Sequence, residues 1–395
     1  MIVQRALKVR IYPNETQKVL LLKTFGCCRL LYNLMLAEHK DVYERLKNNK
    51  RELYEYKYKT EKQYKVEYPF MSEVDSTSLQ QARINLSKAY QNFFRKLKDP
   101  SIPAGQKGFP RFKCKHDRNS YRTPQNGVNL KINFKERKIK LPKLGWVSFR
   151  DSRVLDNYTI NSITVSKTKT GKFYASVQYE IDVEEPKSIN PKAKDLKIKG
   201  LDMSLTNFFI DDEGNSPIYE RNYRINEKKL IALNIRISKE TNKNKKNKLR
   251  MRFNRIHEHI ANKRKDFAEK LSLQLVKEND VIVVESLSLK DMAKEKNYGK
   301  SVHDLGWAFF LQRLKTKAQE RGKIIIEANK WFASSKTCNV CGYVKKDLEL
   351  KDREWTCLNC GAHHHRDVNA AVNLKNYGIE FLTAGTAGIA ALVKN

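Results

Sequence analysis

Two pairs of cysteines constrain the fold of this chain more than any other feature of its sequence. The pairs are Cys338 with Cys341 and Cys357 with Cys360, at the spacing C-x2-C-x15-C-x2-C. Each pair can present two thiolates from one tight turn, and four thiolates complete the tetrahedral shell that zinc prefers. A shell of four sulfurs leaves no position for water, so we expect one Zn²⁺ ion with a structural role.

The other cysteines, and the histidines next to the second pair, are expected to have different roles. Residues 363–365 are three consecutive histidines, which are spare once four thiolates bind, so we expect them to face solvent or phosphate. Cys27, Cys28 and Cys114 share no metal-binding spacing, and we interpret them as packing residues. This usage of cysteine is typical of a reducing compartment.

The formal net charge of +34 predicts a polyanionic partner. Solubility needs a net charge of only about 2–8, whereas a nucleic acid gains affinity from each phosphate that a Lys or Arg neutralises. A membrane surface is the alternative partner, but it would require a basic amphipathic helix or an anchor. The sequence shows no clear example of either, no long apolar run and no signal peptide. We therefore expect nucleic acid and no membrane.

Hydrophobic patterning divides the first half of the chain into a β region and a helical block. Residues 4–13 alternate apolar and polar side chains, which is typical of a strand, and Asn14 with Gln17 can cap the helix that follows. Residues 14 to about 100 have mostly helical spacing, and strand-like runs extend from 103 to about 185. If the first strand pairs with these runs, an antiparallel barrel or sandwich carries the helical block as an insertion.

The second half of the chain alternates strands and helices, which predicts an α/β domain with helices on its sheet. After a linker, the pattern predicts a strand pair, a basic helical region at about 221–277, buried strands at 280–289 and 323–332, and an amphipathic helix at 301–322.

Three acidic residues lie at the boundaries of these buried elements. Asp202 follows an alternating strand, Glu285 ends the run VIVVE, and Asp367 opens the helical segment DVNAAVNL. A lone acid at such a place is usually a solvated terminus or a cap. The ordered set is instead typical of an RNase H-like sheet, in which three acids hold two Mg²⁺ ions about 4 Å apart for phosphodiester hydrolysis. We therefore predict that these three residues are catalytic and bind magnesium.

The chain resembles TnpB, a family of insertion-sequence-encoded RNA-guided endonucleases with a RuvC-like domain, related to type V CRISPR effectors. The resemblance spans about residues 2–376 and rests on the motifs KVRIYPNETQ, GFPRFK, GLDMSLTNF, VVESL, SSKTCNVCG, WTCLNCG and RDVNAAVNL. It implies that Asp202, Glu285 and Asp367 form the RuvC triad and that the four cysteines lie in a target-nucleic-acid-binding insertion. One departure is His365, where the family usually has an aspartate; the sequence alone does not give the effect of this exchange on activity.

The resemblance also implies a multidomain α+β fold in which an RNase H-like (RuvC) α/β nuclease domain carries a four-cysteine zinc insertion. An antiparallel β-barrel wedge domain would carry a helical insertion. The implied bounds are 1–13 and 103–185 for the wedge, 14–102 for the helical recognition domain, 186–332 and 362–380 for the nuclease domain, 333–361 for the zinc insertion, and 381–395 for a tail that need not be ordered.

The implied function is RNA-guided cleavage of DNA in the cytoplasm of a prokaryotic host. The protein, a monomer or weak dimer, would bind a guide RNA from the transposon end and read a short adjacent motif in double-stranded DNA, while base pairing reads the rest. We expect Gln80 and Thr123 to contact base edges of that motif, and Arg111 and Lys113 to be further nucleic-acid contacts. Two alternatives stay open, namely an RNA-guided DNA-binding regulator with weak or no cleavage and a guide-free nuclease that acts on DNA structure.

Overall fold

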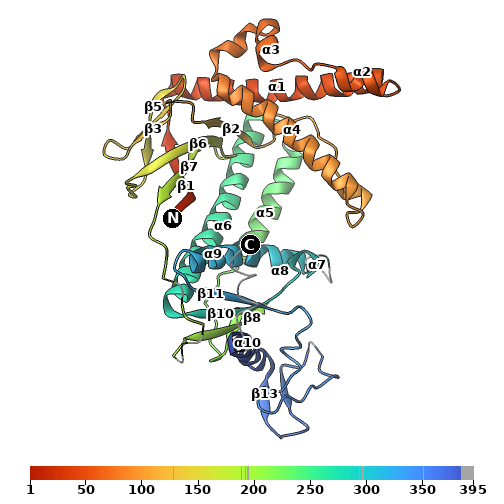
Figure 1. The fold of residues 1–395 in the computed structure, drawn as a ribbon, viewed down its shortest axis with the longest axis vertical. Coiled ribbons are helices and arrows are strands. Elements are labelled where there is room, and N and C mark those ends of the chain that lie inside the picture. Colours follow the sequence, from red (N-terminus) through yellow and green to blue (C-terminus); the bar gives the residue numbers. More distant parts are fainter. Residues whose placement is uncertain are drawn as a thin grey trace. The chain divides into compact units, whose positions relative to one another are not determined.

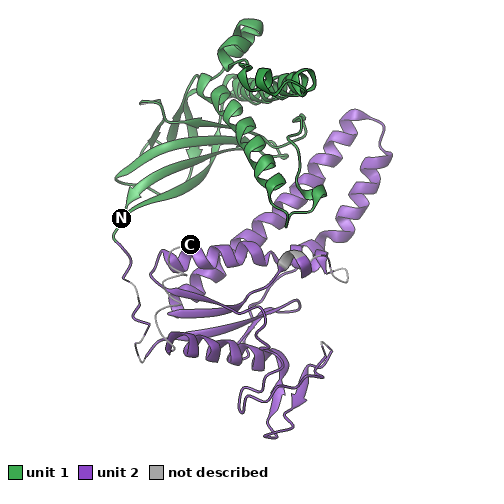
Figure 2. Ribbon diagram, turned by 45° about the vertical axis from the view of Figure 1, so that its right-hand side comes forward, with its two compact units in different colours: residues 1–184 green, residues 185–395 purple. Residues whose placement is uncertain are grey.

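The computed structural model describes residues 1–383 except residues 128, 188, 192, 194, 293, 295–297 and 350. The chain divides into two compact units, residues 1–184 and residues 185–395 (Figure 2). Each unit has its own sheet, its own helices and its own apolar core. The predicted α+β class is therefore confirmed.

Unit 1 is built on one antiparallel sheet of seven strands. Their order across the sheet is β2 (Asn119–Pro124), β6 (Tyr158–Lys167), β7 (Phe173–Asp182), β1 (Ile2–Tyr12), β5 (Gly145–Arg150), β4 (Lys138–Leu141) and β3 (Lys131–Asn133). Because β1 lies between β7 and β5, the predicted pairing of the first strand with the later strands is confirmed, and the helical block is an insertion. The sheet curves into half a barrel and stays open, with β2 and β3 as its edges (Figure 1).

The helices of unit 1 all lie between β1 and β2 in the chain. They are α1 (Glu15–Leu46), α2 (Lys50–Glu55), α3 (Glu61–Glu67) and α4 (Ser76–Lys98), with short 3-10 helices at Pro69–Glu73 and Ala104–Gln106. The predicted cap at the start of α1 is confirmed, since the Gln17 N–H donates to Asn14 Oδ1 at 2.8 Å and the Asn14 N–H donates to Gln17 Oε1 at 3.1 Å.

Helix α1 is long and apolar enough, by length and composition, to cross a membrane. The sequence prediction that the chain has no such run was therefore wrong. Half of the apolar window is buried inside the fold, however, and side chains such as Leu21, Leu31 and Leu36 are fully buried in the core of unit 1. Burial against the sheet and α4 explains why this helix is apolar.

Unit 2 contains a mixed sheet of four strands. Their order is β11 (Ile324–Ala328), β10 (Val281–Glu285), β8 (Ile198–Ser204) and β9 (Phe208–Asp211). The first three run parallel and β9 runs antiparallel to β8, so the predicted strand pair and both predicted buried strands are confirmed. Parallel strands are usually covered on both faces, and residues 281–284 of β10 are at most 1% exposed.

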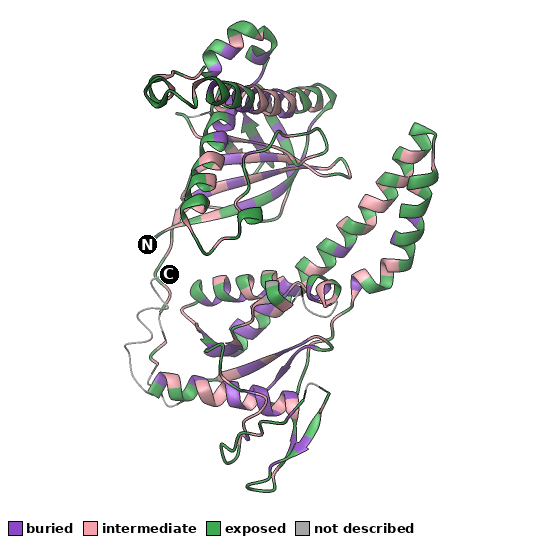
Figure 3. Ribbon diagram, turned by 90° about the vertical axis from the view of Figure 1, so that its right-hand side faces the viewer, coloured by how far each residue is buried: buried purple, intermediate pink, exposed green. Residues whose placement is uncertain are grey.

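Helices cover the two faces of this sheet. Alternate residues of β10 point to opposite faces: Ile282 and Val284 share a core with α6 (Lys243–Glu278) and α9 (Trp307–Gln319), whereas Val281 and Val283 pack with α10 (Arg366–Thr383). The described helices of unit 2 also include α5 (Asn222–Lys239), α7 (Leu289–Met292) and α8 (Gly299–Leu305). The distal part of the α5–α6 hairpin extends from the sheet with mostly exposed residues (Figure 3).

The helix predicted at 301–322 is interrupted. Gly306 has φ of 69° and ends α8, and α9 begins at the next residue. This left-handed conformation is favourable for glycine and ends the hydrogen-bonded ladder of α8. An amphipathic pattern alone does not reveal such a break, because both helices keep apolar faces.

Between β11 and α10 the chain forms the segment that carries the four paired cysteines. It contains a short antiparallel hairpin of β12 (Glu354–Thr356) and β13 (His363–His365). Its C-terminal strand leads directly into α10, which continues to Thr383. The predicted tail therefore overlaps the helix at residues 381–383, and residues 384–395 lie outside the described residues.

Candidate active site

Two of the three predicted catalytic acids lie near the carboxyl ends of neighbouring parallel strands, Asp202 within β8 and Glu285 as the last residue of β10. The register of β8 and β10 runs up to the pair of Leu201 and Val284, so Asp202 and Glu285 follow one residue beyond it. Neighbouring strands are about 4.8 Å apart. Leu201 and Val284 point into the core with α6 and α9, so the next residue of each strand points to the face that α10 covers.

Helix α10 brings Asp367 to the same face. A Cβ atom built on Gly200 would lie 2.0 Å from the carbonyl oxygen of Ala371, so α10 and β8 touch through their backbones at this point. Ala370 and Ala371 are fully buried, as the small-residue motif predicts. Asp367 lies one helical turn before Ala371, on the same side of α10, and is itself only 8% exposed.

The electrostatics show that the three carboxylates share one environment. The pKa of Asp202 is raised well above its usual value by burial and by the charges of Glu285 and Asp367. Burial also raises the pKa of Glu285, although hydrogen bonds with Ser334 and Asp202 oppose this. Like charges in a half-buried site disfavour ionisation, so the site favours the binding of cations.

A guanidinium group from the cysteine-bearing segment already contacts this site. Arg353 Nη1 lies 3.4 Å from each carboxylate oxygen of Asp367. The backbone N–H of Arg366 donates to the Arg353 carbonyl at 2.8 Å, which closes the β12–β13 hairpin beside the helix start. The guanidinium groups of Arg353 and Arg366 both oppose the rise in the pKa of Asp202. No pattern in the sequence singles out Arg353.

Three further polar residues that the sequence reasoning missed hold the site together. Ser334 Oγ donates to Glu285 Oε1 at 2.8 Å. Asn373 Nδ2 donates to the carbonyl of Ser334 at 2.8 Å, and Asn369 Nδ2 donates to the carbonyl of Thr337 at 2.8 Å. Two asparagines four residues apart on the buried face of α10 were the available signal, because buried amides need partners.

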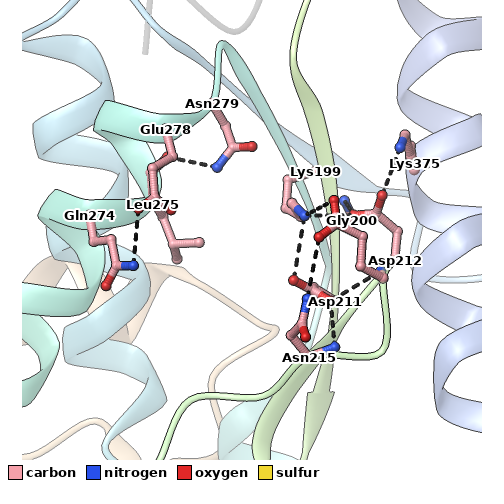
Figure 4. Close-up of polar contacts among 11 residues, drawn as sticks. Lys199, Gly200, Asp211, Asp212, Asn215, Gln274, Leu275, Glu278, Asn279 and Lys375 are labelled. Carbon is pink, nitrogen blue, oxygen red and sulfur yellow. Dashed lines mark hydrogen bonds and ion pairs between the residues drawn. The ribbon is translucent and has the colours of Figure 1, made fainter.

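An ion cluster fastens α10 to β8 beside the Gly200 contact (Figure 4). Asp212 accepts the Gly200 N–H at 3.1 Å and pairs with Lys375 Nζ at 2.7 Å, so one buried carboxylate joins the strand to the helix. Lys199 Nζ lies 3.8 Å from Asp212 Oδ1 and is the third partner of this carboxylate. The position of Asp367 relative to Asp202 is thus set by backbone packing and by this bridge.

The four paired cysteines form a compact group. Their Sγ atoms all lie within 4.8 Å of one another, and the pairs 338/360 and 341/357 are 3.7 and 3.6 Å apart. Four thiolates at a Zn–S distance of about 2.3 Å would be separated by about 3.8 Å, so the group fits zinc. Among the described residues it is the only such group of His, Cys, Asp and Glu side chains, and the three carboxylates are less tightly gathered.

One prediction about the histidines was wrong. His364 does not face solvent: it is buried, and its Nε2 lies 3.1 Å from Cys338 Sγ. The reason is the alternation of β13, which turns His364 inward against Trp355 while His363 and His365 stay exposed. A ring nitrogen at this distance can donate to a thiolate and so support the metal shell from outside.

The four predicted nucleic-acid contacts lie in unit 1 with different exposure. Gln80 is exposed on α4. Thr123 is buried, and its hydroxyl donates to Asp75 at 2.8 Å, so in this structure it is not presented to a base. Lys113 Nζ lies 3.8 Å above the Tyr32 ring.

Arg111 is exposed and lines a cavity of about 420 Å³ in unit 1. The other basic residues around this cavity are Arg29, Lys113, Arg118 and Arg122. This concentration of cations is suited to phosphate groups, and the specific contacts stay predictions.

Three family models match the chain. Residues 1–49 match a "Helix-turn-helix domain", residues 176–296 a "Probable transposase", and residues 307–374 a "Cas12f1-like, TNB domain". In this chain the first match covers one strand and the single unbroken helix α1. Together with the fold, these matches define a protein of the insertion-sequence OrfB class.

Curated relatives narrow this class. A protein of Streptomyces pristinaespiralis named as an RNA-guided DNA endonuclease is 30% identical over 97% of this chain and 91% of its own length. The RNA-guided DNA endonuclease InsQ of Escherichia coli K12 is 29% identical over 96% and 94%. The chain belongs to this family, the TnpB family.

A solved structure agrees with the fold. The protein in a Cas12f1–sgRNA–target DNA complex matches with a TM-score of 0.52 and 14% identity, over 95% of this chain and 99% of that chain. At this identity the match supports the fold alone.

Proposed function

We propose that this protein is an RNA-guided DNA endonuclease that cleaves guide-matched DNA by metal-dependent phosphodiester hydrolysis. The relatives are named for this activity. The observation that carries the proposal is the gathering of Asp202, Glu285 and Asp367 near the carboxyl ends of the two inner strands of a sheet, in a chain with a net charge of +34. All three acids are retained, so a regulator that has lost cleavage is not favoured.

The strand order of unit 2 supports an RNase H-like assignment. β8 and β9 form an antiparallel pair, β10 and β11 extend the sheet parallel to β8, and helices cover both faces. Asp202 lies on β8, Glu285 ends β10 and Asp367 lies in the first turn of α10, which is the arrangement that the sequence predicted for a RuvC-like site. The curved sheet of unit 1 and its helical insertion would then be the wedge and recognition domains, and such an enzyme would act in the cytoplasm, where its DNA is.

The proposed chemistry assigns a role to each residue. Two divalent ions, expected to be Mg²⁺, would supply an activated water and a stabilised leaving oxygen. Asp202, Glu285 and Asp367 would hold them with carboxylate oxygens, the ligands that magnesium prefers. Ser334 orients Glu285 by its 2.8 Å hydrogen bond, and the cysteine shell holds the hairpin that positions Arg353. We assign zinc to that shell because four thiolates leave no open position for catalysis.

A cleavage assay tests the proposal. The protein is purified with the RNA that co-purifies with it and incubated with Mg²⁺ and a plasmid that carries the matching target next to a randomised flank. Asp202→Ala should abolish cutting and keep DNA binding. Asp266→Ala removes an exposed acid of α6 that pairs with Lys270, so it should cut at the wild-type rate. Equal cutting by Asp202→Ala and wild type would refute the catalytic assignment.

A further inference from the structure

The loop that leaves β11 begins beside the candidate active site. β10 and β11 are parallel, and Glu285 pairs with Ala328 at the end of the register. The chain then passes through residues 329–334 before it reaches the first cysteine pair. The loop therefore leaves the sheet at the end of β10 where Glu285 lies.

Most of this loop is anchored. The Asn329 N–H donates to the Tyr377 hydroxyl at 3.3 Å, and the Phe332 ring packs against the Tyr377 ring at a centroid distance of 4.9 Å. Ser334 is tied to Glu285 at 2.8 Å. α10 and β10 therefore hold the loop at both of its ends.

Trp331 is the exposed one of the two aromatic side chains in this loop, with 84% of it accessible to solvent. Its backbone is fixed nevertheless, since the Trp331 N–H donates to Asn329 Oδ1 at 2.9 Å. Lys330 Nζ lies 5.4 Å from the centre of the ring. A single exposed hydrophobic side chain is common on protein surfaces, but here an anchored loop presents a large flat ring next to an ammonium group. The same loop starts at the strand partner of Glu285 and ends at its hydrogen-bond partner Ser334.

The chemistry of such a ring suits an unpaired nucleotide. Base–aromatic stacking contributes about 1–3 kcal/mol per base and tolerates any sequence. The neighbouring ammonium group can contact a phosphate while the base lies on the indole. An enzyme that hydrolyses one strand must hold that strand apart from its complement near the acids.

We propose that Trp331 is a stacking platform for an unpaired base of the strand that enters the active site. Lys330 would accompany it as a phosphate contact. This inference rests on the proposed function, and it adds a ligand-binding position to that site.

The test uses a local fluorescence signal. The full chain is titrated with pentathymidylate, in EDTA and at about 0.3 M salt so that non-specific phosphate contacts are screened. An abasic pentanucleotide, with the same phosphates and no bases, is the matched ligand. Of the other three tryptophans, Trp307 and Trp355 are buried and Trp146 is 44% exposed in unit 1.

The expected results differ between variants. Pentathymidylate should quench the emission of the wild type and the abasic strand should not. Trp331→Phe should lose this quenching and keep most of the affinity, because a phenyl ring still stacks. Trp331→Ala should bind about 5- to 150-fold more weakly, which corresponds to stacking of about 1–3 kcal/mol, with an unchanged melting temperature. Trp146→Ala should bind as the wild type does.

Three results would each overturn the platform: wild-type affinity of Trp331→Ala, undiminished quenching in Trp331→Phe, or equal quenching by the abasic strand. The measurement needs no cleavage, so its failure is distinct from failure of the proposed function. If Asp202→Ala still cut DNA while Trp331→Ala bound pentathymidylate weakly, the catalytic assignment would be refuted and the stacking role of Trp331 would be supported.

Discussion

The contact between Gly200 and α10 leads to the sharpest prediction, which concerns Gly200→Ala. A new Cβ would lie 2.0 Å from the Ala371 carbonyl oxygen and 2.8 Å from the Lys375 nitrogen. Both atoms belong to the backbone, so no side-chain rotation relieves the clash. To reach ordinary contact at 3.4 Å, the helix that carries Asp367 must move away from the strand that carries Asp202.

The size of this clash sets an expected loss of stability and an expected loss of cleavage rate. Overpacking of this kind costs about 1–3 kcal/mol, and a loss of about 2 kcal/mol should lower the melting temperature of a unit of this size by roughly 4–8 °C. A displacement of about 1 Å at a catalytic group can reduce the rate about 10²-fold. We therefore expect Gly200→Ala to lose stability moderately and cleavage almost completely.

Guanidinium denaturation measures the loss of stability, and a guide-dependent cleavage assay measures the loss of activity. Gly26→Ala is the matched control, because nothing lies within 4 Å of the new Cβ and the site is inside helix α1, where alanine should stabilise by about 1 kcal/mol. In Gly378→Ala the new Cβ would lie 2.4 Å from a methyl group of Val283. Adding Val283→Ala to this variant should therefore remove the clash. Wild-type stability and cleavage of Gly200→Ala would refute the proposed packing of α10.

Three further predictions concern the charges and the cysteine shell. Because the pKa of Asp202 is raised, its contribution to stability is present below the usual carboxyl pKa and is lost as pH rises through the raised value. In EDTA at pH 8, the free energy of unfolding of Asp202→Asn should therefore exceed that of the wild type by about 1.4 kcal/mol for each pH unit by which the pKa is raised. Equal melting temperatures at pH 8 would contradict this. Cys341→Ser should reduce bound zinc from one equivalent to nearly none by elemental analysis and expose the segment to proteolysis, since such sites fold on their metal. Cys114 is exposed and not a packing residue as the sequence predicted, so Cys114→Ser, outside the shell, should change neither. A full zinc equivalent in Cys341→Ser would refute the assignment. Arg353→Ala should tighten Mn²⁺ binding by up to about fivefold in calorimetry, because the exposed Arg353 guanidinium, whose ion pair contributes about 0–1 kcal/mol, no longer competes for the buried Asp367 carboxylate. Lys351→Ala, at an exposed lysine that pairs with Glu349, is the control. Weaker Mn²⁺ binding by Arg353→Ala would refute competition.

Local patterns in the sequence were good predictors because they depend on residues that are near one another in the chain. The capping pair Asn14 and Gln17, the alternation of β1 and the apolar run of β10 all appear where the sequence indicated. Gly306 shows the limit of such patterns, because an isolated glycine is compatible with a continuous helix until its φ of 69° is known.

The sequence by itself determined which residues have the chemistry for a site: three acids at the ends of buried elements, and four thiolates at a metal-binding spacing. Only the tertiary structure decided what surrounds them. Ser334 reaches Glu285 across 49 residues and Arg353 reaches Asp367 across 14, and neither separation has a period that a sequence pattern reveals. The physical reason is that helix and strand periodicity sets the face on which a side chain lies, whereas its partners depend on how the elements pack.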